Sequence, residues 1–438
     1  MNSKTIAIIA VIILAAAGVS AVLYFTLGDD KPSYDNRGRL MILGNANNDD
    51  YINEDDIDYL RAIIYGEVER SPLADANNDG VIDEKDIEFV QNMIGLNKKV
   101  VSQHAYERME IFYMNPHGGA MNIDSVRYPL DRIAVVGSNV AVTVKLIGAA
   151  DKVKCRAGGV WDGALSSDII KLPAVSDSIF LAEYERTMQH VVRNGSIDAI
   201  LTLDDPKYVP NYQDFLNSGI KVVRSSSSDG LESISGALTM GYLLGTFEGS
   251  HKYAQFCDEV LNYVQSKVGG KDKSDRVTSL SVTMYNFIGG LTSDYYAATQ
   301  LAGSKNLADW NTTIQRFNIG DEWLLNERYD ADFIIHMRSI GYGSVDADEI
   351  WMENSVYFKA MGAYSNGKYF IVNGNMPVAL RVLYMAHLFY PEIITEKYVT
   401  EKHQYCIDNF VKNLAEQNYK VSDGTFVISI DMVSEQYR

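Results

Sequence analysis

The chain has 438 residues and a net charge of −18, and hydrophobic residues make up 47% of it. This length allows two or three domains with separate cores, and the composition excludes a disordered polymer. Fourteen acidic and three basic residues fall between positions 45 and 97, so most of the charge lies in one stretch. No basic cluster is dense enough to neutralise phosphates, which disfavours nucleic-acid binding. Three separated cysteines allow at most one disulfide.

The N-terminus contains an uncharged run of 23 residues, from position 5 to position 27. As a helix this run would span about 34 Å, enough for the hydrocarbon core of a bilayer. Lys4 precedes it and Asp29 and Asp30 follow it, which favours a cytoplasmic N-terminus. We therefore expect a transmembrane anchor at residues 1–28 and a single-pass location in the cell membrane, with the body on the extracytoplasmic face. A cleaved signal peptide is the alternative, because residues 19–21 resemble a cleavage site.

Two acidic loops, 45–56 and 75–86, repeat at a spacing of 30 residues. Both place oxygen-bearing side chains at loop positions 1, 3, 5, 9 and 12. Calcium takes about six to eight oxygen ligands, and a 12-residue loop delivers them at this spacing. Each loop leads into a segment with an apolar face of helical period, which Gly66 and Gly95 are expected to end. The repeat therefore predicts an all-α, calcium-binding EF-hand pair at 36–97.

The aspartate at position 12 of each loop makes the pair resemble a type I dockerin. The first loop departs from that pattern, because Asn45 replaces the usual aspartate and Asp50 replaces the glycine of the sharp turn. Its calcium is therefore expected to be held more weakly. The resemblance implies these calcium ligands: Asn45, Asn47, Asp49, Asn53 and Asp56 with the Tyr51 carbonyl, and Asp75, Asn77, Asp79, Asp83 and Asp86 with the Val81 carbonyl.

A dockerin also implies a cohesin-like protein partner. The positions that often carry small hydroxyl residues in cohesin recognition are Glu54-Asp55 and Glu84-Lys85 in this chain. That departure leaves open a second interpretation, in which the module is a spacer or brace beside the larger domain.

Beyond residue 100, short apolar strands alternate with helical patterns, which predicts parallel sheets covered by helices. A helical stretch at 251–268 separates two such series. We therefore expect an α/β fold with an N-lobe at 100–250 and a C-lobe at 275–438, joined by a stiff helix. The expected strands are 132–137, 197–203, 220–223, 277–284, 332–337 and 369–372. One helix is expected after residue 137 and through residue 146, and three more are expected near 212–217, 295–301 and 357–361.

The order of several short motifs resembles the class III solute-binding proteins of ABC transporters, the iron-siderophore and cobalamin type. The N-lobe motifs are the segments 132–140, 145–153, 198–201 and 216–223, and the C-lobe motifs are 302–306, 329–335, 363–370 and 388–392. The resemblance implies two Rossmann-like lobes joined by a long helix. It also implies an ABC permease as partner and an iron chelate, haem or a corrinoid as ligand.

Ligands of such folds bind where loops leave the carboxyl ends of the strands. Arg338 would pair there with a ligand carboxylate or catecholate, and His336 is the one histidine considered as an axial metal ligand. The candidate ligand-binding residues are Ser138, Asn139, Trp161 and Tyr208 in the N-lobe, and Tyr285, Tyr295, Tyr296, His336, Arg338, Tyr342 and Asn373 in the C-lobe.

No catalytic motif is present: the histidines lack zinc spacing, and neither a Walker A sequence nor GxSxG occurs. We therefore expect a binding protein for transport and not an enzyme. The alternative is a cell-surface assembly protein that uses the dockerin-like module without transport.

Overall fold

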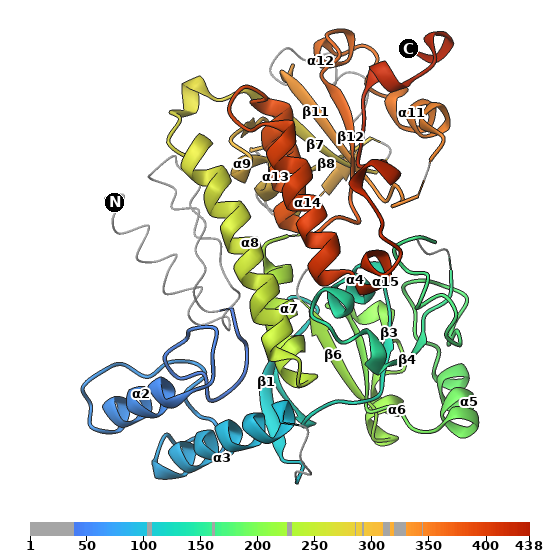
Figure 1. Cartoon of the computed structure of the whole chain (residues 1–438). Coiled ribbons are helices and arrows are strands. Elements are labelled where there is room, and N and C mark those ends of the chain that lie inside the picture. The colour runs from blue at the N-terminus through green and yellow to red at the C-terminus, as the bar shows by residue number, and fades with distance from the viewer. Residues whose placement is uncertain are drawn as a thin grey trace.

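The computed structural model describes residues 39–102, 107–159, 163–225, 230–284, 286–290, 293–309, 316–318, 330–343 and 345–438. These ranges form a mixed α/β protein with a small helical module at its N-terminal side (Figure 1). The segment predicted to be an anchor, together with Trp161 and Tyr285, lies outside the described residues.

The module consists of α2 (Glu54–Ile64) and α3 (Glu84–Val101). Asn53 and Asp83 cap the two helices in the same way, with side chains that accept backbone N–H groups of the first turn. The two helices share a small core that contains Ile57, Leu60 and Val90. Helix α2 ends next to Gly66 as expected, but α3 continues beyond Gly95, so the prediction that Gly95 ends it is wrong.

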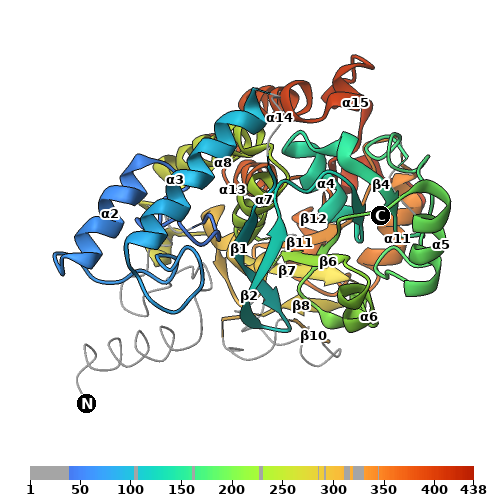
Figure 2. The same cartoon turned by 90° about the horizontal axis from the view of Figure 1, so that it is seen from below.

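A hairpin that the sequence analysis did not identify joins the module to the body. Strands β1 (Glu110–His117) and β2 (Ala120–Arg127) pair antiparallel around a Gly118-Gly119 turn, where both glycines have positive φ. Ile42 forms an isolated bridge with Tyr113, and the Asn115 amide donates to the Val222 carbonyl at 2.9 Å. Figure 2 shows the hairpin between the α2–α3 pair and the N-lobe.

The N-lobe is built on a four-stranded parallel sheet with the order β4-β3-β5-β6. The predicted strands near 132, 197 and 220 and the predicted helix at 212–217 are confirmed. The elements are β3 (Ile133–Val135), α4 (Ser138–Leu146), β4 (Val153–Arg156), α5 (Tyr184–Asn194), β5 (Ala199–Leu203), α6 (Tyr212–Asn217), β6 (Lys221–Ser225) and α7 (Glu232–Leu243).

Helix α8 (Phe247–Val268) connects the two lobes and begins four residues before the predicted position. Its 22 residues span about 33 Å, and α7 and α13 (Val378–Phe389) pack along it. One hydrophobic core runs from Leu40 and Met93 through the N-lobe sheet and α8 into the C-terminal helices. The module therefore shares part of its core with the body.

The C-lobe sheet has the order β10-β8-β7-β11-β12-β13, with β9 paired to β7. Side chains of β11 alternate between the α8-side core and a second core around Trp351. The predicted helix near 357–361 is wrong, because 356–361 form turns between two helices. The strands are β7 (Thr278–Met284), β8 (Phe287–Gly289), β9 (Lys305–Asn306), β10 (Arg316–Asn318), β11 (Phe333–Arg338), β12 (Tyr369–Asn373) and β13 (Val427–Ile428), and the other helices are α9 (Asp294–Leu301), α11 (Ala347–Ser355), α12 (Gly362–Ser365), α14 (Glu396–Phe410) and α15 (Lys412–Ala415).

Candidate functional site

The two acidic loops share one backbone arrangement. The final aspartate of each loop turns back into it: Asp56 accepts the N–H groups of Asn47 and Asn53 at 3.3 and 2.9 Å. Asp86 accepts those of Asn77 and Asp83 at 3.2 and 2.9 Å. Both carboxyl groups are fully buried, and this burial raises the pKa of Asp56 to about 7 and raises that of Asp86 as well.

The first position of each loop differs in its hydrogen bonding. The Asp75 carboxylate accepts the N–H groups of Asp79 and Gly80 at 3.1 and 2.9 Å. In the first loop the Asn45 amide instead donates to the carbonyls of Leu40 and Asp49 at 2.9 and 2.6 Å. The Asn45 Oδ1 atom is buried without a partner, so it is an oxygen available to a ligand.

The sixth positions also differ. Gly80 has φ of +91°, and a Cβ added there would meet nothing within 4 Å. Asp50 occupies this position in the first loop without a positive φ, and its carboxylate pairs with Arg39. Within the described ranges, no group of three or more His, Cys, Asp or Glu side chains is arranged to hold a metal ion.

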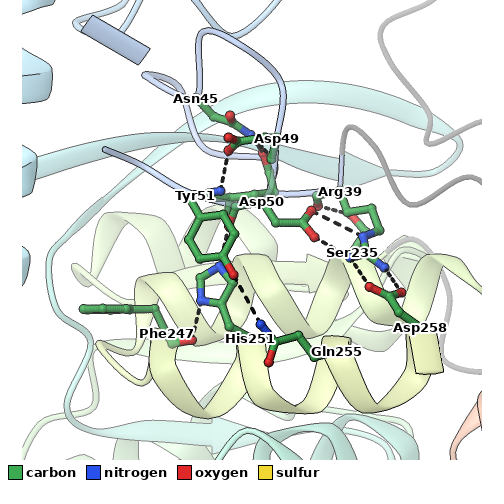
Figure 3. Close-up of polar contacts among 11 residues, drawn as sticks. Arg39, Asn45, Asp49, Asp50, Tyr51, Ser235, Phe247, His251, Gln255 and Asp258 are labelled. Carbon is green, nitrogen blue, oxygen red and sulfur yellow. Dashed lines mark hydrogen bonds and ion pairs between the residues drawn. The ribbon is translucent and has the colours of Figure 1, made fainter. Parts of the chain in front are cut away.

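The first loop packs directly against α8 (Figure 3). The Tyr51 ring stacks on His251, with centroids 4.2 Å apart and planes within 5°. The two His251 ring nitrogens contact the Phe247 and Asp50 carbonyl oxygens. Close by, the main chain of Arg39 accepts a hydrogen bond from the Ser235 hydroxyl of α7 at 2.6 Å. The module is therefore docked on α7 of the N-lobe and on α8, the helix between the lobes.

The carboxyl ends of the N-lobe strands gather three of the predicted ligand-binding residues. Ser138 and Asn139 begin α4 after β3, and Tyr208 ends a short 3₁₀ helix, Pro206–Tyr208, after β5. Because β3 and β5 are adjacent parallel strands, these residues share one edge of the sheet. All three side chains are partly exposed.

Sequence reasoning missed Phe180 at this edge. Its ring lies 5.7 Å from that of Tyr208, centroid to centroid, and its side chain is 45% exposed. The Lys207 ammonium lies 5.0 Å from the Tyr208 ring centroid. Phe180 belongs to an irregular segment, so no period in the sequence indicated it.

The C-lobe residues separate into two groups. Arg338 and Asn373 are partners across β11 and β12, and Arg338 and Tyr295 are partly exposed. Asn373 is fully buried, and its Oδ1 atom accepts the Asn375 N–H at 2.8 Å. Tyr296 is also buried, in the core around Trp351.

Two further candidates are core residues. His336 lies on the same face of β11 as Ile334, and its Nδ1 atom is 2.8 Å from the Tyr369 hydroxyl. Burial, followed by the nearby Arg338 charge, lowers the pKa of His336 to about 3. The Tyr342 ring packs against Phe426 inside the core, with centroids 5.0 Å apart. His336, which the sequence analysis considered as an axial metal ligand at the strand ends, is therefore buried in the core.

Two cavities lie away from these strand ends. One, of about 430 Å³, lies beside the contact between the module and helices α7 and α8. Tyr51, Ile94 and Tyr242 are among its lining residues. Another of about 630 Å³ lies at the amino ends of β11 and β12, beside Phe333 and Lys368. Ligands of open α/β sheets bind outside the carboxyl ends of the strands, so neither cavity lies where a ligand is expected.

The fold is similar to that of solved solute-binding proteins. A periplasmic solute-binding protein from Veillonella parvula aligns with 69% of this chain and 93% of its own, at 15% identity and a TM-score of 0.52. Helicobacter pylori CeuE, solved in complex with Ni-His, aligns with 71% of this chain and 99% of its own, at 14% identity and a TM-score of 0.53. No protein-family profile matches the sequence, and no curated protein matches it.

These findings correct the predicted single-pass location in the cell membrane. No helix in the described parts of the chain is long and apolar enough to cross a bilayer. Two solved proteins with a similar fold, both from Veillonella parvula, are described as periplasmic. Residues 5–27, on which the prediction rested, lie outside the described residues.

Proposed function

We propose that this chain is an extracytoplasmic solute-binding protein that delivers a metal chelate to an ABC permease. The ligand would be an iron chelate, haem or a corrinoid, bound without catalysis. The main support is the arrangement of two lobes with parallel central strands, β8, β10 and β13 of the C-lobe being antiparallel, linked by the long helix α8. The similarity in fold to periplasmic solute-binding proteins supports the same class.

The chemistry of the two strand edges supports a large, partly aromatic ligand. On the N-lobe, Phe180 and Tyr208 offer neighbouring rings with a lysine at one side. On the C-lobe, Tyr295 lies in the first turn of α9 and Arg338 is the last residue of β11, and both are partly exposed. Aromatic faces suit a planar or conjugated chelate, and a guanidinium suits its anionic groups.

A thermal-shift screen of the full chain tests the ligand class. A ligand that binds only the native state stabilises it by about 2.7 kcal/mol at 100 times its dissociation constant. We expect one member of a panel of ferric siderophores, haem and cobalamin to raise the melting temperature with one-to-one stoichiometry. If no metal complex does so while a cohesin-like protein binds tightly, the cell-surface assembly function replaces this proposal.

We propose calcium binding by the two loops as a second function. Each loop offers five oxygen-bearing side chains and one backbone carbonyl, which matches the oxygen ligands that calcium takes. The unpartnered, buried Asn45 Oδ1 atom supports this in the first loop. In the second loop, four of the five side chains are carboxylates. The second site is therefore expected to be the tighter one.

Calorimetric titration of the full chain with calcium tests this second function. We expect two binding events in the wild type. Asp79→Ala should remove the tighter event, and Asp49→Ala should remove the weaker one, because each deletes a carboxylate at position 5. A wild type that shows neither heat nor stabilisation with calcium would exclude it.

The contacts of the first loop favour a brace over a cohesin-binding module. Asp50 and Tyr51 of that loop are engaged with Arg39 and His251, so this face of the module is already covered. Glu54 occupies a position expected to contact a cohesin. Its Oε1 atom lies 3.6 Å from the Lys98 Nζ atom of α3, and Glu54 also lines the cavity beside α8. We therefore propose that the module braces the body.

A further inference from the structure

One buried guanidinium joins the first acidic loop to the helix that connects the lobes. Arg39 is 5% exposed and pairs with Asp50 of the loop. On its other side it donates to both carboxylate oxygens of Asp258 on α8, at 2.7 and 3.1 Å. Figure 3 shows Arg39 between the two carboxylates.

This bridge is sheltered from water. The Asp50 and Asp258 side chains are 14% and 17% exposed, so the cation and both anions have given up most of their hydration. Removing one partner from such a group leaves an incompletely compensated charge in a low-dielectric setting. The position of the loop therefore depends on the α8 carboxylate.

The bridge meets the loop between two of the expected calcium ligands. Asp49 precedes Asp50, and its Oδ1 atom accepts the Tyr51 N–H at 2.6 Å. The Tyr51 carbonyl is the expected backbone ligand, while the Tyr51 ring stacks on His251 of α8. Two consecutive loop residues, Asp50 and Tyr51, are thus held against α8, directly after the expected ligand Asp49.

The second loop provides an internal comparison. At the positions that match Asp50 and Tyr51 it has Gly80 and Val81, and the Val81 side chain is 56% exposed. A Cβ at Gly80 would meet nothing within 4 Å. The equivalent part of the second loop therefore faces open space.

We propose that calcium binding at the first loop is coupled to docking of that loop on α8, whereas calcium binding at the second loop is independent of the body. This inference rests on the proposed calcium function. Coupling of this kind is reciprocal: α8 orders the first site, and the ion at that site strengthens the hold of the module on α8. The first ion thereby becomes a structural element of the connector between the lobes.

The test compares two neighbouring substitutions on α8 in the full chain. Asp258→Asn removes the charge that holds Arg39. Glu259→Gln is the matched control, because Glu259 pairs with Lys402 of α14 and not with the loop. Calcium binding is measured by calorimetric titration, and hydrogen exchange is measured over residues 247–268 with calcium and with chelator.

We expect Asp258→Asn to weaken the weaker calcium site about tenfold and to leave the tighter site unchanged. Calcium should slow exchange across α8 in the wild type and in Glu259→Gln, and this protection should be lost in Asp258→Asn. Unchanged binding at both sites in Asp258→Asn overturns the coupling alone. A wild type that binds no calcium overturns the coupling together with the calcium function.

Discussion

The ring of Tyr51 lies parallel to the ring of His251, although 200 positions separate the two residues in the chain. The first belongs to an acidic loop of the N-terminal module and the second to the helix between the lobes. Their contact, together with the Arg39 bridge, makes the module a part of the folded body. Its removal is therefore expected to affect the stability of the whole protein.

The stacked pair can be tested by truncation. Tyr51→Ala should lower the free energy of unfolding by about 1 kcal/mol, because an aromatic pair contributes roughly 0.5 to 1.5 kcal/mol beyond its buried area. Tyr65→Ala is the control, since Tyr65 is 72% exposed at the end of α2. Denaturant unfolding gives both values. Equal effects of the two substitutions would contradict the role of the stack.

Asn97 is a second point of attachment between module and body. Its side chain accepts a hydrogen bond from the Tyr128 hydroxyl at 2.9 Å and donates one to the Tyr242 hydroxyl at 3.2 Å. Asn97→Ala should cost about 1 to 3 kcal/mol, because two buried hydroxyl groups lose this partner. Combining it with Tyr128→Phe and Tyr242→Phe should recover part of that loss. Strictly additive losses in denaturant unfolding would argue against the network.

Two buried histidines predict how stability changes with pH. Burial lowers the pKa of His403 to about 3, and burial followed by the Arg338 charge does the same for His336. In the unfolded chain both have a pKa near 6.5, so only the unfolded state takes up protons between about pH 6.5 and pH 3. Each histidine therefore stabilises the fold above this window. That contribution is lost as the pH falls, by about 1.4 kcal/mol per pH unit.

Unfolding at pH 7 and pH 5 checks this effect. His403→Phe should lose less stability than the wild type over that interval, even though it gives up the contact with the Tyr384 hydroxyl. Tyr384→Phe removes the same contact but leaves His403 in place, so it is the control and should follow the wild type. A His403→Phe variant with the wild-type slope would show that this histidine is protonated in the fold.

The proposed ligand contacts at the carboxyl ends of the strands can be tested with whichever chelate the screen identifies. Phe180→Ala and Tyr208→Ala should each weaken binding about tenfold, because their rings offer adjoining apolar faces. Arg338→Ala should weaken an anionic chelate about tenfold or more and a neutral corrinoid little, since a charge-assisted hydrogen bond contributes about 1.5 to 3 kcal/mol. Val192→Ala, at an 83% exposed site on α5, is the control. Unaltered affinity in all three variants would place the ligand elsewhere.

Local periodicity predicted the regular elements well and their ends less well. The pattern at 212–217 gave α6 at its observed bounds, because a short helix between two strands depends mostly on local spacing. Helix α3 passes Gly95, although glycine costs about 1 kcal/mol in a helix interior. Burial of Leu96 and the Asn97 hydrogen bonds offset that cost through contacts with distant residues. The β1–β2 hairpin escaped prediction because Pro116 interrupts an otherwise strand-like run.

The spacing of residues along the chain is enough to predict the alternation of strands and helices, the long connecting helix and the repeated acidic loops. The exposure of the candidate residues depends on the three-dimensional packing: Arg338 is partly exposed, whereas His336, two residues earlier, is buried against Tyr369. It also decided that the guanidinium of Arg39 pairs with both Asp50 and Asp258, which is 219 positions further along the chain than Arg39. Burial and charge pairing are set by neighbours in space, and local spacing does not specify those neighbours.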